Sequence, residues 1–221
     1  QGTGSGDHFE KLEFEGSFVR GFGTWSISGA VEGLEFTPRL RGALPTECDR
    51  WLEPLASIRG RTQFGFRVTQ PAAESPQHAI PPLDFRIVGD VSEGRIDDNR
   101  LPEPLTDVSA HVEADVQGLR IERLQARCGT SAVQAELATG GFTRQSPVET
   151  SVTLNGWSLE RIPPGLLPTH AVEELRKISL RGTADVTGKF TFNGQKWSHQ
   201  ASANLRQVSL IHPLFPLPLT E

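Results

Sequence analysis

The chain has 221 residues, of which 22 are basic and 27 acidic, so its formal net charge is −5. It shows no basic stripe of the kind that nucleic-acid-binding proteins carry. No run approaches the roughly 18 consecutive apolar residues of a membrane-spanning helix. Methionine is absent, and we therefore interpret the sequence as a piece of a longer protein.

Apolar and polar residues alternate along most of the chain. This period of two predicts strands that have one apolar face and one polar face. After a first run at 11–14, the clearest runs are 63–68, 83–91, 108–116, 133–137, 148–154, 180–192 and 197–205. We expect a mostly β fold of roughly ten to twelve antiparallel strands.

Turn-forming residues and one break in the alternation divide these runs. The pair Asn193-Gly194 predicts a type I′ hairpin, because both residues tolerate positive φ. The step from Ile121 to Leu124 breaks the alternation, and a β-bulge would restore it. The glycine-rich residues 2–6 lack the Lys-Ser/Thr ending of a phosphate-binding loop, so we expect a flexible connection or a turn there.

Two short segments predict helices. In 46–55, Thr46 suits an N-cap with Asp49 at the third helical position, and Trp51 begins an apolar stripe. Segment 169–177 repeats this pattern and ends in two cations. We expect Trp51 to fill the junction between its helix and the sheet.

The sequence also repeats itself. Leu44-Pro45-Thr46 recurs as Leu167-Pro168-Thr169, a shift of 123 residues. The proline motif at 101–107 recurs at 215–221, a shift of 114 residues. Repetition at nearly fixed spacing is typical of modular stacking. We predict a first unit at 10–132 and a second, truncated unit at 133–221, with 1–9 as the end of a preceding unit or a linker.

Two helices of this length cannot cover the apolar faces of ten or more strands. These faces must therefore pack against one another in a closed β-sandwich, surround a cavity, or bind a ligand. A curved antiparallel sheet that forms a U-shaped groove would meet the last requirement.

The passages 105–112 and 118–133 resemble the AsmA-like family, which includes TamB-type envelope proteins. Its members repeat a strand, a turn before Leu-x-Ile, a segment Leu-x-Ala-x-x-Gly-x-Ser-x-Val, and a further strand that ends in glycine. Here that segment begins at Leu124, and the further strand at 134–139 ends at Gly140. Through the internal repeat, the resemblance covers most of the chain.

The resemblance implies a non-enzymatic segment of a long periplasmic protein of two-membrane bacteria, anchored in the inner membrane. It implies a bridge-like β-groove, continued by neighbouring repeat units, through which phospholipid acyl chains pass between the membranes during outer-membrane assembly. It implies no cofactor. The long proline-rich connection at 70–82 departs from the simplest members.

The alternation supplies candidates for the groove lining. These are the aliphatic and aromatic residues on the predicted apolar strand faces: Phe64, Phe66, Val68, Leu83, Phe85, Ile87, Val108, Val112, Val116, Leu119, Ile121, Val152, Leu154, Leu180, Val186, Phe190 and Phe192.

Sites of other kinds are poorly supported. The six histidines are scattered without metal-ligand spacing, and no Gly-x-Ser-x-Gly nucleophile motif occurs, so we predict neither a metal site nor an enzyme. Cys48 and Cys128 are either free and buried or joined in one bridge. The alternative functions are a structural or adhesive β-sandwich repeat on the cell surface and a carbohydrate-binding module, in which Trp25, Trp157 and Trp197 could stack on sugar.

Overall fold

The structure is a computed structural model of the whole chain. It describes residues 1–19, 24–37, 40, 57–71, 82–99, 101–160, 179–212 and 215–220, and only the backbone at 179–180 and from 210 onward. The two predicted helices at 46–55 and 169–177, with Cys48 and Trp51, lie outside the described residues. No helix in the described part of the chain is both long and apolar enough to cross a membrane.

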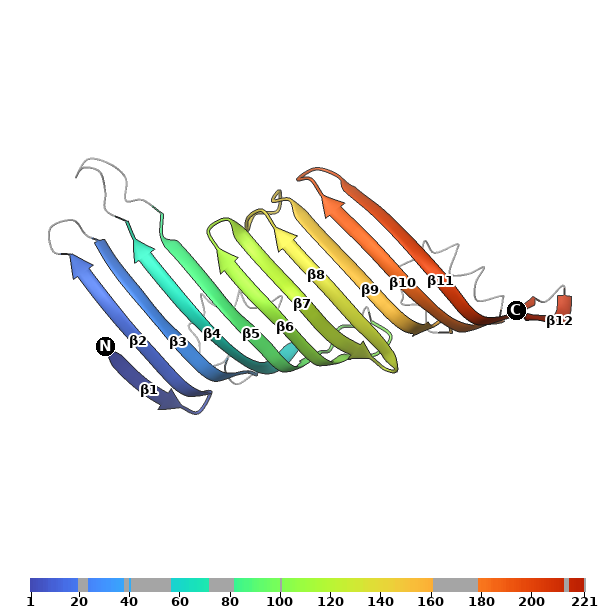
Figure 1. Cartoon of the computed structure of the whole chain (residues 1–221), viewed down its shortest axis with the longest axis horizontal. Helices are drawn as coiled ribbons and strands as arrows, with labels where there is room; N and C mark the ends of the chain where they lie inside the picture. Colours follow the sequence, from blue (N-terminus) through green and yellow to red (C-terminus); the bar gives the residue numbers. More distant parts are fainter. Residues whose placement is uncertain are drawn as a thin grey trace.

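Twelve strands form one sheet in which every strand pairs with its neighbour in the sequence (Figure 1). All pairings are antiparallel. The strands are β1 (Gly2–Gly6), β2 (Phe9–Val19), β3 (Thr24–Phe36), β4 (Ile58–Gln70), β5 (Asp84–Ile96), β6 (Leu105–Asp115), β7 (Gly118–Cys128), β8 (Ser131–Thr139), β9 (Val148–Ser158), β10 (Ser179–Phe192), β11 (Trp197–His212) and β12 (Phe215–Thr220).

The predicted mostly β fold and strand number are thus confirmed. The closed β-sandwich is wrong for the described residues, because all of their strands belong to one open sheet. The accessible surface agrees with this, since the chain exposes 15786 Å² where a compact monomer of 24.2 kDa would expose about 10,000 Å².

Several of the long strands contain a β-bulge. The extra residue adopts left-handed φ angles of 51–67° at Gly33, Glu93, Asp107, Arg123, Gly156 and Gln207. The bulge predicted between Ile121 and Leu124 is confirmed, with Arg123 as the extra residue. Each bulge shifts the alternation by one residue, so that apolar side chains before and after it share a face. Bulges also bend strands, and the long strands curve in their lower halves in Figure 1.

Two of these bulges recur at the spacing of the sequence repeat. Gly33 in β3 and Gly156 in β9 lie 123 residues apart and have φ angles of 65° and 67°. Glu93 in β5 and Gln207 in β11 lie 114 residues apart and have φ angles of 52° and 51°. Equivalent strands therefore bend at equivalent positions.

Two local predictions were wrong. The hairpin at Asn193 is present, but its loop spans 193–196, because Phe192 pairs with Trp197. Only Gly194 has positive φ, at 92°, and the Asn193 side chain accepts hydrogen bonds from the Gln195 and Lys196 amides at 3.1 and 2.9 Å. These two hydrogen bonds hold the loop in an Asx turn, so a second residue with positive φ is not needed.

The glycine-rich residues 2–6 form the edge strand β1 instead of a flexible connection or a turn. β1 pairs with the first half of β2, from Gly2 opposite Phe14 to Gly6 opposite Phe9. Backbone pairing outweighs the low strand preference of glycine here. The turn lies one step later, at Asp7 and His8.

The packed core is small and lies near the middle of the sheet. It consists of Val108, Ala126, Cys128 and Val133, with Ile96, Leu105, Leu124, Leu154 and Trp157 packed against it. Among the described residues, no large side chain is completely buried. Strand pairing and this central cluster, rather than a thick interior, hold the sheet together.

Candidate functional site

The strand register gives the sheet one apolar face. Directly paired residues of antiparallel strands point to the same side. One row of such pairs crosses from β2 to β10 and consists of Leu12, Val31, Phe64, Gly89, Val112, Ile121, Leu137, Thr150 and Phe190. The rows on either side that continue this alternation form what we call the apolar face.

The register places most of the sequence-predicted lining residues on this face. They are Phe64, Phe66, Val68, Phe85, Ile87, Val108, Val112, Leu119, Ile121, Val152, Leu154, Val186, Phe190 and Phe192. Leu83 precedes β5, and Val116 lies in the turn between β6 and β7. Of Leu180, only the backbone is described, and it pairs with Leu210.

The sequence prediction missed the N-terminal part of this face. Phe14, Phe18, Trp25, Ile27 and Val31 lie on it in β2 and β3. Their alternation is visible in the sequence, but glycines interrupt it and glutamates surround it. The small residues Ala126 and Cys128 were also absent from the predicted lining, although the predicted bulge between Ile121 and Leu124 brings them onto this side.

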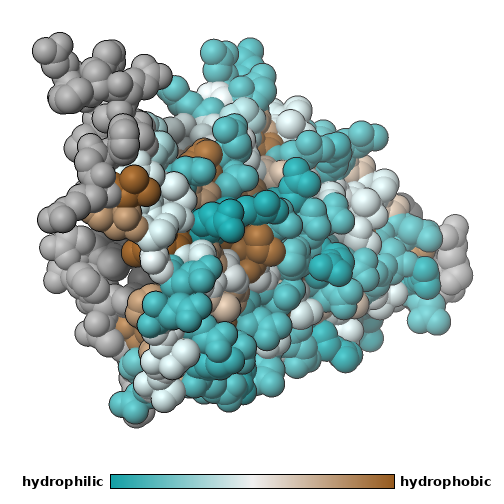
Figure 2. All heavy atoms as spheres, turned by 60° about the vertical axis from the view of Figure 1, so that its left-hand side comes forward, coloured by the Kyte–Doolittle hydropathy of each residue, from teal (hydrophilic) through white to brown (hydrophobic). Residues whose placement is uncertain are grey.

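The side chains of the apolar face are buried in the middle of the sheet and exposed at both ends. Val108, at the centre, is 5% exposed. At the N-terminal end, Phe18 is 67% exposed, and at the C-terminal end Trp197 and Leu205 are 60% and 54% exposed. Apolar side chains at the N-terminal end also appear as patches between polar ones in Figure 2. Large apolar side chains exposed together on one face are typical of binding sites.

Aromatic rings contact one another at two places on this face. The rings of Phe64 and Phe66 lie 6.4 Å apart, and those of Phe192 and Trp197 lie 5.2 Å apart. Their ring planes are tilted by 52° and 31°, which lies between the stacked and the edge-to-face arrangements. Trp157 packs on the core, whereas Trp197 is exposed beside Phe192.

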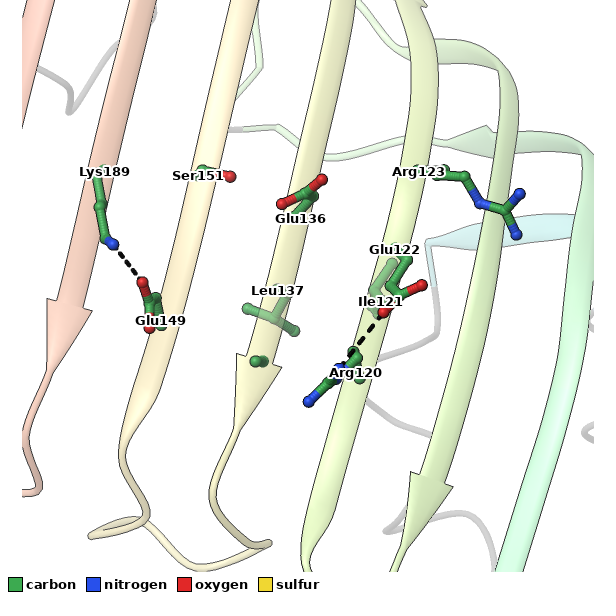
Figure 3. A pocket seen from close by; sticks show the side chains of 10 residues that line it. Arg120, Ile121, Glu122, Arg123, Glu136, Leu137, Glu149, Ser151 and Lys189 are labelled. Carbon is green, nitrogen blue, oxygen red and sulfur yellow. Dashed lines mark ion pairs between the residues drawn. The ribbon is translucent and has the colours of Figure 1, made fainter.

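The opposite side of the sheet, which we call the charged face, carries the ion pairs. Examples are Lys11 with Glu13 at 2.8 Å and Lys189 with Glu149. A shallow depression of about 510 Å³ opens on it across β7 to β10 (Figure 3). Its lining is Arg120, Ile121, Glu122, Arg123, Glu136, Leu137, Ala138, Glu149, Ser151 and Lys189.

This depression does not assemble a reactive group. Arg120 pairs with Glu122 at 3.6 Å, and Lys189 pairs with Glu149, so these charges neutralise one another in place. Arg123 points away from both pairs in Figure 3. Exposed pairs of this kind contribute at most about 1 kcal/mol each. We interpret the depression as part of a solvated, salt-bridged surface.

Five described groups have a shifted pKa: Lys11, Arg61, Asp97, His111 and Cys128. His111 in β6 donates a 2.9 Å hydrogen bond from its Nδ1–H group to Asp90 Oδ1, and this contact raises the pKa of His111. Glu113 lies 3.6 Å from Nε2 and acts in the same direction. Burial raises the pKa of the free Cys128 thiol, which donates to the Glu103 carbonyl at 3.4 Å. Among the described residues, no group of three His, Cys, Asp or Glu could hold a metal ion.

Comparison with known proteins gives no match: no protein-family model fits the chain, and no curated sequence and no solved structure is similar to it.

Proposed function

We propose that this chain is a non-enzymatic segment of an AsmA-like protein of the bacterial envelope, and that its apolar face shelters phospholipid acyl chains on their way between the inner and outer membranes. The observation that carries the proposal is the open sheet itself. One side is apolar from β2 to β11 and exposed at both ends, while the other side is charged.

Lipid transport requires a surface that keeps acyl chains out of water but does not bind them at one specific position. Exposing an acyl chain to water costs about 0.8 kcal/mol per CH₂ group. A face made of Phe, Leu, Ile and Val offers that shelter at many equivalent positions. Because it lacks a convergent set of polar groups in the described residues, a chain could move along it without breaking strong hydrogen bonds.

The dimensions fit a conduit better than a pocket for one ligand. The ten strands from β2 to β11, spaced about 4.8 Å apart, extend for about 43 Å across the strands. This exceeds the about 30 Å thickness of the hydrocarbon core of a bilayer. An apolar path of this length could hold several acyl chains in succession.

In this proposal the parent protein is anchored in the inner membrane and extends into the periplasm. Further repeat units of the same polypeptide continue the groove. The charged face then contacts periplasmic water, where its many ion pairs keep it soluble.

The test is native mass spectrometry of the chain after expression in the periplasm of a two-membrane bacterium. We expect phospholipid to co-purify with the folded protein and to be removed by delipidation without unfolding. A folded, monodisperse protein that carries no lipid and takes up none from phospholipid vesicles would contradict the proposal.

A further inference from the structure

Every second connection of the chain lies at the same edge of the sheet, because sequence neighbours pair antiparallel throughout. The connections β2–β3, β4–β5, β6–β7, β8–β9 and β10–β11 lie at the upper edge in Figure 1. We call their described residues, with the adjoining strand ends, the upper rim: 18–19, 71, 82–83, 116–117, 140–147 and 193–197. The described connections at the opposite edge form the lower rim: 7–8, 37, 40, 57, 97–99, 101–104, 129–130 and 159–160.

The upper rim carries most of the exposed large apolar side chains. Of the ten such side chains among the described residues, six lie on the upper rim and none lies on the lower rim. Phe142 is 57% exposed, and Leu83 and Val116 are each 47% exposed. The six are Phe18, Val19, Leu83, Val116, Phe142 and Trp197. Each of the five connections thus presents at least one apolar side chain to solvent at this edge.

The connection 140–147 holds Phe142 in a hydrogen-bonded loop. The Thr143 amide donates to the Ser146 hydroxyl at 3.0 Å, and the Ser146 amide donates to the Thr143 carbonyl at 3.1 Å. The ring of Phe142 meets that of Phe85, on the apolar face, with centroids 6.0 Å apart. A fixed loop therefore presents this ring to solvent where the upper rim joins the apolar face.

The two rims also differ in charge. The upper rim contains two cations, Arg144 and Lys196, and no acidic residue. The nearest carboxylates belong to strand ends, at Asp84 and Asp115, and that of Asp115 accepts a hydrogen bond from the Gln117 amide at 2.7 Å. The lower rim contains five acidic residues and neither lysine nor arginine: Asp7, Asp97, Asp98, Glu103 and Glu160.

We propose that the upper rim docks on the surface of a phospholipid bilayer that carries anionic headgroups. Tryptophan and other aromatic rings are favoured at the membrane–water interface. Lysine and arginine beside them are attracted by anionic lipid, which strengthens binding by about five-fold for each cation. The acidic lower rim then points away from the membrane.

The layout of the upper rim fits a bilayer better than a protein partner. Its apolar side chains are spread over the ten strands from β2 to β11, a distance of about 43 Å. A protein interface usually gathers its contacts in one compact patch of about 800 Å² on each partner. A bilayer surface is continuous, so it can receive a long row of separate side chains.

This docking does not depend on acyl-chain shelter. Together with the proposed function, it would apply where the groove meets a membrane. The rim adjoins the apolar face at Phe85 and at Phe192, which contacts Trp197. A phospholipid that leaves the bilayer at the rim would therefore meet that face directly.

The experiment is flotation of the intact chain with vesicles of phosphatidylethanolamine and phosphatidylglycerol, compared with vesicles of phosphatidylcholine alone. We expect the chain to float with the anionic vesicles, less with the neutral ones, and less again at high salt. Phe142→Ser and Trp197→Ser should each weaken binding by at least about ten-fold, whereas Phe142→Leu should keep most of it. Because both side chains are exposed, the variants should fold as the parent does, which circular dichroism checks.

A pair of lysine variants provides the matched control for charge. Lys196→Gln removes a cation from the upper rim and should weaken binding to anionic vesicles by about five-fold. Lys11→Gln changes the net charge equally, but Lys11 lies on the charged face beside Glu13, so binding should stay as in the parent. Equal effects of the two variants, or undiminished flotation of Phe142→Ser, would overturn docking through this rim.

This proposal and acyl-chain shelter can fail separately. A chain that floats with anionic vesicles in this way but carries no phospholipid in native mass spectrometry would support docking and contradict shelter. A chain that carries phospholipid but floats with neither kind of vesicle would contradict docking alone.

Discussion

Phe190 shows at the scale of a single residue how the two faces differ. Its ring lies on the apolar face at 36% exposure, whereas Thr187, three positions earlier in β10, is exposed on the opposite side. Substitution by glutamate at either position places a carboxylate on the same strand. On the apolar face this carboxylate would contact bound acyl chains, whereas on the charged face it would contact water.

We predict that Phe190→Glu abolishes lipid binding while the protein stays folded, because a charge at a half-exposed position need not be buried unless acyl chains cover it. The matched variant Thr187→Glu should bind lipid as the parent does. Native mass spectrometry and circular dichroism measure the two properties. Unfolding of Phe190→Glu would show that this residue is buried in a closed core, and unchanged lipid binding would place the lipid elsewhere.

His111 supplies a second prediction at this scale. Asp90 and Glu113 stabilise its protonated form in the folded state and raise its pKa above 6.5. Because the folded pKa is the higher one, this stabilisation is complete below pH 6.5 and is lost as the pH rises through the folded pKa.

The measurement is an NMR titration of the His111 ring in the parent and in Asp90→Asn. We expect the substitution to lower the pKa toward its ordinary value, since the first and largest cause of the shift is removed. Lys11 serves as a distant check, because its raised pKa depends on Glu13 and should not change. An unaltered His111 titration in Asp90→Asn would contradict the described contact.

At the scale of elements, the bulges decide which residues share a face. Non-glycine residues occupy left-handed positions in four of them, Glu93, Asp107, Arg123 and Gln207. A residue with a Cβ atom in this conformation costs about 1–2 kcal/mol. The sheet tolerates this cost because each bulge keeps apolar residues on one side and bends the strand.

Two substitutions at bulge positions should change the free energy of unfolding in opposite directions. Arg123→Gly should stabilise the protein by about 0.5–1 kcal/mol, because glycine relieves the left-handed strain but loses more chain entropy on folding. Gly156→Ala, at φ 67° with open space around the new Cβ atom, should destabilise it by about 1 kcal/mol. Urea unfolding measures both. Equal signs for the two variants would contradict the assigned backbone conformations.

The sequence predicts the elements unequally well. Strict alternation identifies most of the long strands but not β3 (Thr24–Phe36), and an interruption of the alternation identifies the bulge at Arg123. The turn at Asn193 was mistaken because its side chain accepts two backbone hydrogen bonds, which sequence preference alone does not reveal. The strand β1 was missed because glycines carry no apolar pattern, and only pairing with β2 makes them a strand.

At the scale of the whole molecule, alternation does not distinguish an open sheet from a sandwich. Both architectures need strands with one apolar face. The difference lies in the pairing order, and here each strand pairs with its sequence neighbours in a single sheet. The repeat, visible in the sequence at 123 and 114 residues, is matched by the bulges at Gly33 and Gly156 and at Glu93 and Gln207. The boundaries of the units at 10–132 and 133–221 stay a prediction.

The measurement that most directly tests acyl-chain shelter is site-specific photocrosslinking in a two-membrane bacterium. A photoreactive phenylalanine analogue replaces Phe66 or Phe190 on the apolar face, or Arg67 or Thr187 on the charged face, and adducts are identified by mass spectrometry. We expect phospholipid adducts at the first two positions and none at the other two. Adducts at all four positions, or none at Phe66 and Phe190, would contradict the account.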